Sequence, residues 1–176
     1  MTAGTLIGML ALQLFLILIN AFFAATEIAV LQLNAGKLRH MAEEGDKHAP
    51  RILKLVENPS SFLSAIQVGI TLAGLLASAF AADNFADPLA GWLYESVGFT
   101  AFSYTVLRTI CIVLITIILS YFTLVLGELV PKQVALHRPY GVAKVTTVVI
   151  SAIAVLMKPV IKLLSASTKA VLLLFG

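Results

Sequence analysis

Long apolar runs alternate with short charged stretches along the chain. The first run extends from Thr5 to Leu33, the second from Phe62 to Ala82, and the third from Tyr104 to Leu126. Each is long enough to cross a bilayer as a helix, which takes about 20 apolar residues. A fourth run, residues 142–157, is shorter and contains Lys144. We expect this fourth segment to be an interfacial or re-entrant helix that does not cross.

The segment between the first two runs has a different pattern. Leu38, Met41, Ile52 and Leu55 recur at rough helical spacing, and Gly45 with the following aspartate interrupts them. Two short amphipathic helices at the cytoplasmic membrane surface are predicted there. The expected fold is therefore an all-α polytopic membrane protein. Residues 1–141 form a three-span domain, with spans of about 5–33, 62–82 and 104–127, and residues 142–176 form a juxtamembrane helical segment.

Composition supports this class and excludes others. Of the 176 residues, 60% are hydrophobic and 12% are charged, whereas soluble domains are about 45–50% apolar and about 25% charged. A soluble globular protein and a disordered chain are both excluded. A disulfide scaffold and a cysteine-rich metal site are excluded as well, because Cys111 is the single cysteine. The net charge of +3 does not indicate nucleic-acid binding, because the basic residues lie where a membrane protein would place them.

The distribution of lysine and arginine predicts the topology. Five basic residues lie between residues 34 and 61, none lies between 83 and 103, and six follow the third span. Basic loops face the cytoplasm, so the N-terminus is expected outside and the C-terminus inside a cell's inner (plasma) membrane. This orientation requires an odd number of crossings. The basic cytoplasmic helices can also contact anionic lipid headgroups.

Each of the three spans carries one stripe of polar residues at helical spacing. In lipid, polar stripes face one another or a water-filled cavity. Ser, Thr and Asn side chains also form hydrogen bonds that only join helices, which is the structural alternative. The side chains offer oxygen atoms and no His or Cys, which suits hard cations such as Mg²⁺ or Na⁺. The stripes are Gln13, Asn20, Glu27 and Asn34; Ser64, Gln67, Thr71, Gly74 and Ser78; and Thr109, Thr116, Ser120, Thr123 and Gly127.

The segment Gly127-Glu128-Leu129-Val130-Pro131-Lys132 is the most specific local feature. Proline has no N–H, so the carbonyl of Gly127 loses its helical partner and needs another one in lipid. A cation beside Glu128 is such a partner, and broken helices of this kind hold ions in transporters. A plain proline stop with Glu128 in the headgroups is the alternative. Glu27, the other carboxylate within the spans, can touch the ion or pair with Lys132 or Lys37.

These motifs together resemble the transmembrane domain of the CNNM/CorC magnesium transporter family, which includes haemolysin C-like bacterial proteins. The resemblance rests on residues 20–23 with Glu27, on residues 62–71, and above all on residues 127–132. It implies a homodimer of three-helix subunits that exports Mg²⁺, with Na⁺ as the coupling ion. It also implies a downstream pair of CBS modules and a small CorC-type domain, so the chain is expected to be the membrane part of a longer protein.

The resemblance also implies which residues form the ion site. The ligands would be Glu128, Gly127, Asn20 and Ser64, with Thr71 as a further candidate. Supporting roles fall to Pro131, Lys132, Glu27, Gln67, Ser120 and Thr123. A second hypothesis is a non-transporting cation-sensing regulator that signals through the cytosolic modules. An enzyme is not expected, because the spans contain no His-Glu-x-x-His run and no Ser/His or paired-Asp arrangement.

Overall fold

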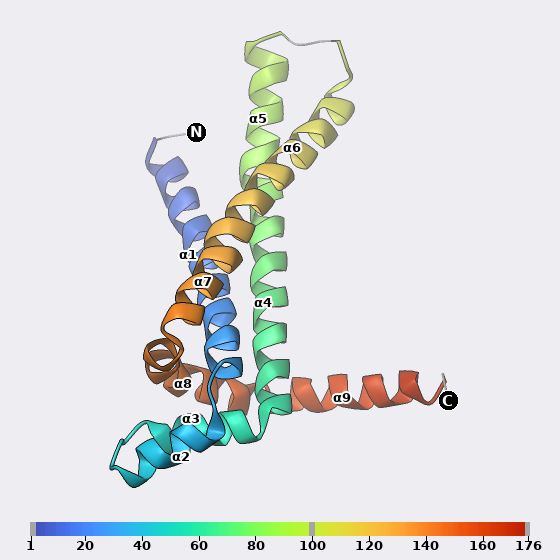
Figure 1. Ribbon diagram of the computed structural model, residues 1–176. Helices are drawn as coiled ribbons and strands as arrows, with labels where there is room; N and C mark the ends of the chain where they lie inside the picture. The colour runs from blue at the N-terminus through green and yellow to red at the C-terminus, as the bar shows by residue number, and fades with distance from the viewer. Residues whose placement is uncertain (1–2, 99–100, 175–176) are drawn as a thin grey trace. The chain divides into compact units, whose positions relative to one another are not determined.

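The computed structural model describes residues 3–98 and 101–174, and within these ranges the regular structure is entirely helical (Figure 1). This confirms the expected all-α polytopic membrane fold. The helices fall into two compact units, which are described separately. The first unit comprises residues 1–21 and 70–131, and the second comprises residues 22–69 and 132–176.

The first unit contains the beginning of the first expected span, the end of the second and the whole of the third. It includes the beginning of α1 (Ala3–Leu31), the end of α4 (Pro59–Ala81), and α6 (Tyr104–Leu124). The helix that starts as α4 does not stop near residue 82. It continues through η1 (Ala82–Ala86), α5 (Asp87–Gly91) and η2 (Trp92–Ser96), of which η1 and η2 are π-helical. Most of the loop expected at residues 83–103 is therefore helical.

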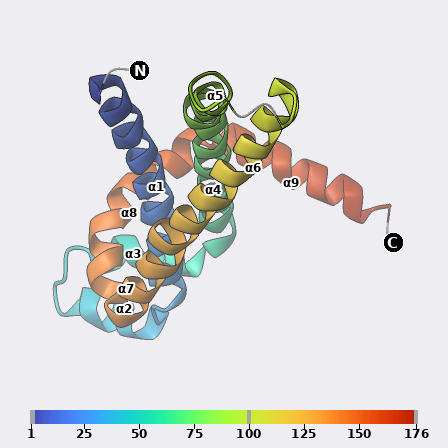
Figure 2. The same cartoon turned by 90° about the horizontal axis from the view of Figure 1, so that it is seen from above.

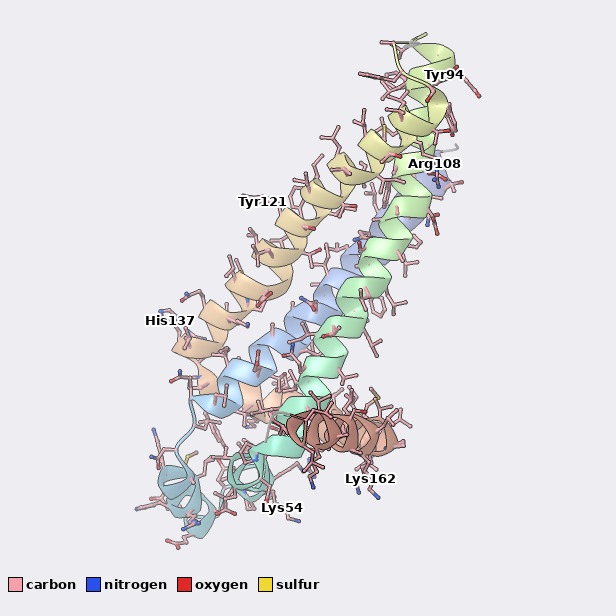
Figure 3. All side chains as sticks on the ribbon, turned by 90° about the vertical axis from the view of Figure 1, so that its right-hand side faces the viewer. Lys54, Tyr94, Arg108, Tyr121, His137 and Lys162 are labelled. Carbon is pink, nitrogen blue, oxygen red and sulfur yellow. The ribbon has the colours of Figure 1, made fainter. Side chains whose placement is uncertain are left out.

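A small core and an ion pair hold α5 against α6. Ala86, Ala90, Leu107 and Cys111 form a buried cluster, and the small side chains of the two alanines and the cysteine allow the two helices to approach closely. Arg108 Nε and Nη2 donate to the two carboxylate oxygens of Asp87 at 2.8 and 3.0 Å. Arg108 lies at the same end of the unit as Tyr94 (Figure 3). The arginine near the start of the third span thus has a fixed carboxylate partner.

The second unit contains the predicted amphipathic helices, α2 (Ala35–Glu43) and α3 (Ala49–Glu57). Their apolar faces pack with residues of α1, α7 (Val130–His137) and α8 (Pro139–Leu156) around a core that includes Leu38, Ile52 and Ala143. Gly45, between the two helices, has a φ of 94°, a conformation that glycine adopts without strain. The two helices and the break at Gly45 are as the sequence predicts.

Hydrogen bonds from polar side chains fix the helix ends in this unit. α1 ends at Leu31, and the Asn34 side chain accepts from the Lys37 N–H at 3.1 Å as the cap of α2. Asn34 was expected on the polar stripe of the first span, so that part of the stripe prediction is wrong: capping a new helix explains its polarity. Asp46 Oδ1 accepts from the N–H groups of His48 and Ala49, at 2.7 and 3.1 Å, where α3 begins.

The number of candidate spans exceeds the predicted number. Within the described residues, four helices are long and apolar enough to cross a bilayer, and the fourth is Pro139–Leu156. By length and composition, Pro139–Leu156 could therefore cross a bilayer, although the sequence predicts that this segment does not cross. In the view from above, α8 and α9 (Lys158–Leu172) are seen from the side, while α4 is seen nearly end-on (Figure 2). Both helices thus run across residues 59–69 of α4, which belong to the same unit, and this favours an interfacial placement.

Candidate cation site in the first unit

A cavity of about 370 Å³ lies among α1, α4 and α6 within the first unit. Polar residues from all three stripes line it, together with alanine, glycine and leucine. One residue from η3 (Val125–Leu129), Glu128, completes the lining. The polar lining residues are Gln13, Ser78, Thr116, Ser120, Thr123 and Glu128.

The helix around the proline motif widens instead of breaking. Val125–Leu129 form a π-helical turn, in which the Val130 N–H donates to the Val125 carbonyl. Such a turn just before Pro131 makes room for the proline ring, which in a regular helix clashes with the carbonyl four residues earlier. Where the sequence predicts a broken helix or a proline stop, the structure therefore has a wide turn, and the chain continues as helix through α7.

The carbonyl that Pro131 deprives of a helical partner has found a partner on another helix. Asn20 Nδ2 donates to the Gly127 carbonyl at 3.1 Å, and the bond is buried. The carbonyl accepts only, so the amide nitrogen of Asn20 must face it, and this fixes the orientation of the amide. The Asn20 Oδ1 atom consequently points elsewhere and is buried without a hydrogen-bond partner among the described residues.

Gly127 permits this contact because it has no side chain. A Cβ atom at this position would lie 3.3 Å from both Asn20 Nδ2 and the Ile17 carbonyl oxygen. In the wide turn, Gly127 and Glu128 face different sides of the helix. Gly127 faces α1, while Glu128 lines the cavity together with Thr123, five residues earlier. The stripe expected to end at Gly127 thus ends at Glu128, because a π-helical turn brings residue i+5 onto the face of residue i.

The other predicted site residues lie in different surroundings. Thr71 is exposed and is not among the residues lining the cavity. Ser64 is half-buried and Gln67 is exposed, and both belong to the second unit. Their roles as ligands or supporting residues stay predictions.

The second carboxylate of the spans is paired. Lys132 Nζ lies 3.6 Å from Glu27 Oε2 in the second unit, and both side chains are half-buried. This is one of the arrangements that the sequence left open for Glu27. Among the described residues, no group of three or more His, Cys, Asp or Glu side chains could hold a metal. A cation in the first unit would therefore rely on one carboxylate and neutral oxygens.

Sequence reasoning did not assign three polar residues of the cavity, Ser78, Thr116 and Gln13, to the site, and Gln13 is the buried one of the three. Its side chain is 3% exposed, and neither Oε1 nor Nε2 has a hydrogen-bond partner among the described residues. The available signal was its place on the first stripe, seven residues before Asn20. The stripe alone could not separate a cavity residue from a contact between helices.

Comparison with known proteins identifies the family. Residues 11–176 match the family described as the cyclin M (CNNM) transmembrane N-terminal domain. This chain belongs to the CNNM transmembrane-domain family. The CNNM domain is 36% identical over 161 residues to the UPF0053 protein sll0260 of Synechocystis, covering 92% of the chain and 35% of that protein. It is 30% identical over 159 residues to the UPF0053 inner membrane protein YfjD of Escherichia coli, covering 90% of the chain and 33% of that protein.

A shorter match has a transport function in its name. The CNNM domain is 38% identical over 61 residues to the polyamine export protein of Salmonella typhimurium, covering 35% of the chain and 14% of that protein. The chain spans about a third of the length of the first two relatives. Its membership of a transmembrane-domain family and its long apolar helices together show that the CNNM domain is a multi-pass membrane domain that contacts the lipid bilayer.

Proposed function

We propose that this CNNM domain forms the pathway of a Mg²⁺ transporter, with export driven by entry of Na⁺. The buried Asn20 Oδ1 atom without a hydrogen-bond partner carries the proposal. A buried polar atom left unpaired costs about 1–3 kcal/mol, so its presence beside a carboxylate motif favours a ligand-binding role. Membership of the family and the named export function of one relative support transport as the class.

The donor set suits a hard cation that keeps part of its water. Mg²⁺ is usually held through one or two carboxylates and retained waters, in octahedral geometry. Glu128 would supply the charge from the lining of the cavity. Neutral oxygens would come from Asn20 Oδ1 on α1 and from the Gly127 carbonyl in the same turn as Glu128, although neither residue is among those lining the cavity. An ion with six waters needs roughly 200 Å³ at about 30 Å³ per water. The cavity of about 370 Å³ accommodates it.

A polyamine is the second candidate cargo because of the name of the Salmonella relative. A polyamine carries several ammonium groups along an apolar chain, and each group needs an acceptor when it leaves water. Among the described lining residues of the cavity, Glu128 is the single carboxylate and no aromatic side chain is present. Compact divalent charge therefore matches the cavity better than extended polyvalent charge.

Assembly and orientation are parts of the same proposal. We expect a homodimer with the N-terminus outside, and a cation-sensing regulator is the alternative to a transporter. Small residues recur at every fourth position of α4, a pattern that permits close contact between helices, but they face the interior of this chain. Ala65, Ala73, Ala77 and Ala81 are buried within the chain, and Gly69 lies against the Phe23 ring. A partner subunit would have to use other residues.

Basic side chains in the second unit support contact with anionic lipid. Lys54 of α3 and Lys162 of α9 lie at the same end of this unit (Figure 3). Lysines near a membrane surface contribute about 1 kcal/mol each to binding of anionic lipid. Binding of the protein to phosphatidylserine-containing vesicles at rising salt concentration would measure this contribution.

Flux through liposomes tests the proposal directly. The intact protein is reconstituted into vesicles loaded with a Mg²⁺-sensitive dye, and flux is compared for the parent, Glu128→Gln and Glu95→Gln. Glu95 is an exposed carboxylate in η2, so it is the matched control for loss of one negative charge. We expect flux to be lost in Glu128→Gln alone. Binding of Mg²⁺ without flux by the parent would favour the regulator, and spermidine flux without Mg²⁺ flux would favour the polyamine.

A further inference from the structure

The cavity contains more polar groups than the Glu128 site uses. Gln13 is seven residues before Asn20, which corresponds to about 10 Å along a helix. Asn20 contacts Gly127, 107 residues later. The same offset places Gln13 at the level of Ser120, and both residues line the cavity. The polar groups therefore form two levels along α1 and α6, one at Gln13 and the other at Asn20.

The level at Gln13 has a composition of its own. Ser78 of α4 and Thr116 and Ser120 of α6 line the cavity with Gln13. These side chains offer an amide and three hydroxyl groups and carry no charge. Neutral oxygens of this kind can accept hydrogen bonds from water bound to a cation, and they can also contact a weakly hydrated ion directly.

Gln13 is the decisive residue because the structure leaves its amide unsatisfied. It is 3% exposed and unpaired among the described residues at both polar atoms. A glutamine that only joined two helices would be hydrogen-bonded to one of them. An apolar side chain of similar length would avoid the cost of burying the amide. A buried, unpaired amide in the lining of the cavity therefore favours a ligand-binding role.

We propose that Gln13, with Ser78, Thr116 and Ser120, forms a second cation station that holds hydrated Mg²⁺ through its waters. This inference rests on the proposed function and extends it, because the ion would occupy this neutral station at one end of its path and the Glu128 site at the other. A neutral station binds weakly, so it admits and releases the ion. The carboxylate at Glu128 provides the main affinity.

The test combines flux with stability in the intact protein. Gln13→Met keeps the length of the side chain and removes its amide. Leu14→Met, at the next position on α1, is the control, because Leu14 lines an apolar cavity that Gln13 also borders and is not among the residues lining the polar cavity. Without divalent ions, Gln13→Met should be as stable as the parent or more stable. The concentration of Mg²⁺ for half-maximal flux should rise about fivefold, as expected for one lost hydrogen bond to the ion's water.

The possible outcomes separate this proposal from the previous one. Lower thermal stability of Gln13→Met without ions, or flux equal to that of Leu14→Met, would overturn the station. If the parent transports no Mg²⁺, the proposed transport function fails. The station is then judged by the thermal stabilisation that MgCl₂ gives in detergent with Glu128→Gln as the background. In that background, a residual stabilisation that Gln13→Met removes supports the station, and its absence in both proteins refutes it.

Discussion

The bond between Asn20 and the Gly127 carbonyl should contribute to stability because Pro131 leaves that carbonyl without a helical partner. Asn20→Ala removes the donor that lies 3.1 Å from the carbonyl oxygen. One net hydrogen bond is worth about 0.5–1.5 kcal/mol, and a buried carbonyl left unpaired costs about 1–3 kcal/mol. Hydrogen bonds between helices in membrane proteins average about 0.6 kcal/mol. We expect a loss of about 1–2 kcal/mol in the free energy of unfolding.

A double-mutant cycle tests the cause as well as the size of this effect. Pro131→Ala restores an N–H four residues after Gly127, so the helix itself can satisfy the carbonyl. In that background, Asn20→Ala should cost about 1 kcal/mol less than in the parent, because the carbonyl no longer depends on Asn20. The free energies would be measured by titration with sodium dodecyl sulfate in mixed micelles, followed by circular dichroism.

A second asparagine provides the control. Asn84 Nδ2 donates at 2.8 Å to the Phe80 carbonyl four residues earlier on the same helical segment, so Asn84→Ala removes a local bond and no bond between helices. It should cost less than Asn20→Ala and show no coupling to Pro131→Ala. The reasoning is refuted if the costs of Asn20→Ala and Pro131→Ala simply add. Equal costs for the two asparagine variants would refute it too.

Two further predictions concern the second unit. The hydroxyl of Tyr140 donates to Asp46 Oδ2 at 2.6 Å; this bond, followed by those from the N–H groups of His48 and Ala49, holds the pKa of Asp46 below its ordinary value. Tyr140→Phe should raise that pKa in an NMR titration of the Asp46 carboxyl. A carboxyl group with a lowered pKa stabilises the fold at pH values above its ordinary pKa, and this gain is lost as the pH falls through the lowered pKa of the folded state. The parent and variant should therefore differ in stability at neutral pH and converge in acid. An unchanged titration would contradict the role of the hydroxyl. A cysteine at Ser151 in α8 should resist an impermeant thiol reagent added outside intact cells, while one at Ser96 should react, and reaction of a cysteine placed after Lys169 would contradict three crossings.

The sequence predicted the helices well because each depends on local patterns. Apolar runs of sufficient length, the break at Gly45 and the helical spacing around Leu38 all act over a few residues. The helical continuation from Ala82 to Ser96 could not be predicted this way, because the acidic residues and proline of that segment are typical of loops. Its helix is held by contacts with residues far along the chain, such as the pair Asp87–Arg108.

The candidate site shows the same division between local and distant causes. The unpaired Gly127 carbonyl followed from Pro131 alone, but the sequence could not show that Asn20 would be its partner. The side of the helix on which Glu128 lies could not be predicted either, because a regular helix of 3.6 residues per turn places Gly127, and not Glu128, on the same side as Thr123. The exposure of Thr71 depends on how the helices turn about their axes, which no spacing within one helix determines.

The wide turn at Val125–Leu129 has a consequence for any scan of the third span. Each residue of a helix advances about 100° around its axis, and the turn holds one residue more than a regular helix would. A single helical wheel drawn from Tyr104 to His137 therefore misplaces every position after Leu129 by about one residue's rotation. Accessibility or alanine data from this segment should be analysed as two helices with different phases, joined between residues 125 and 129.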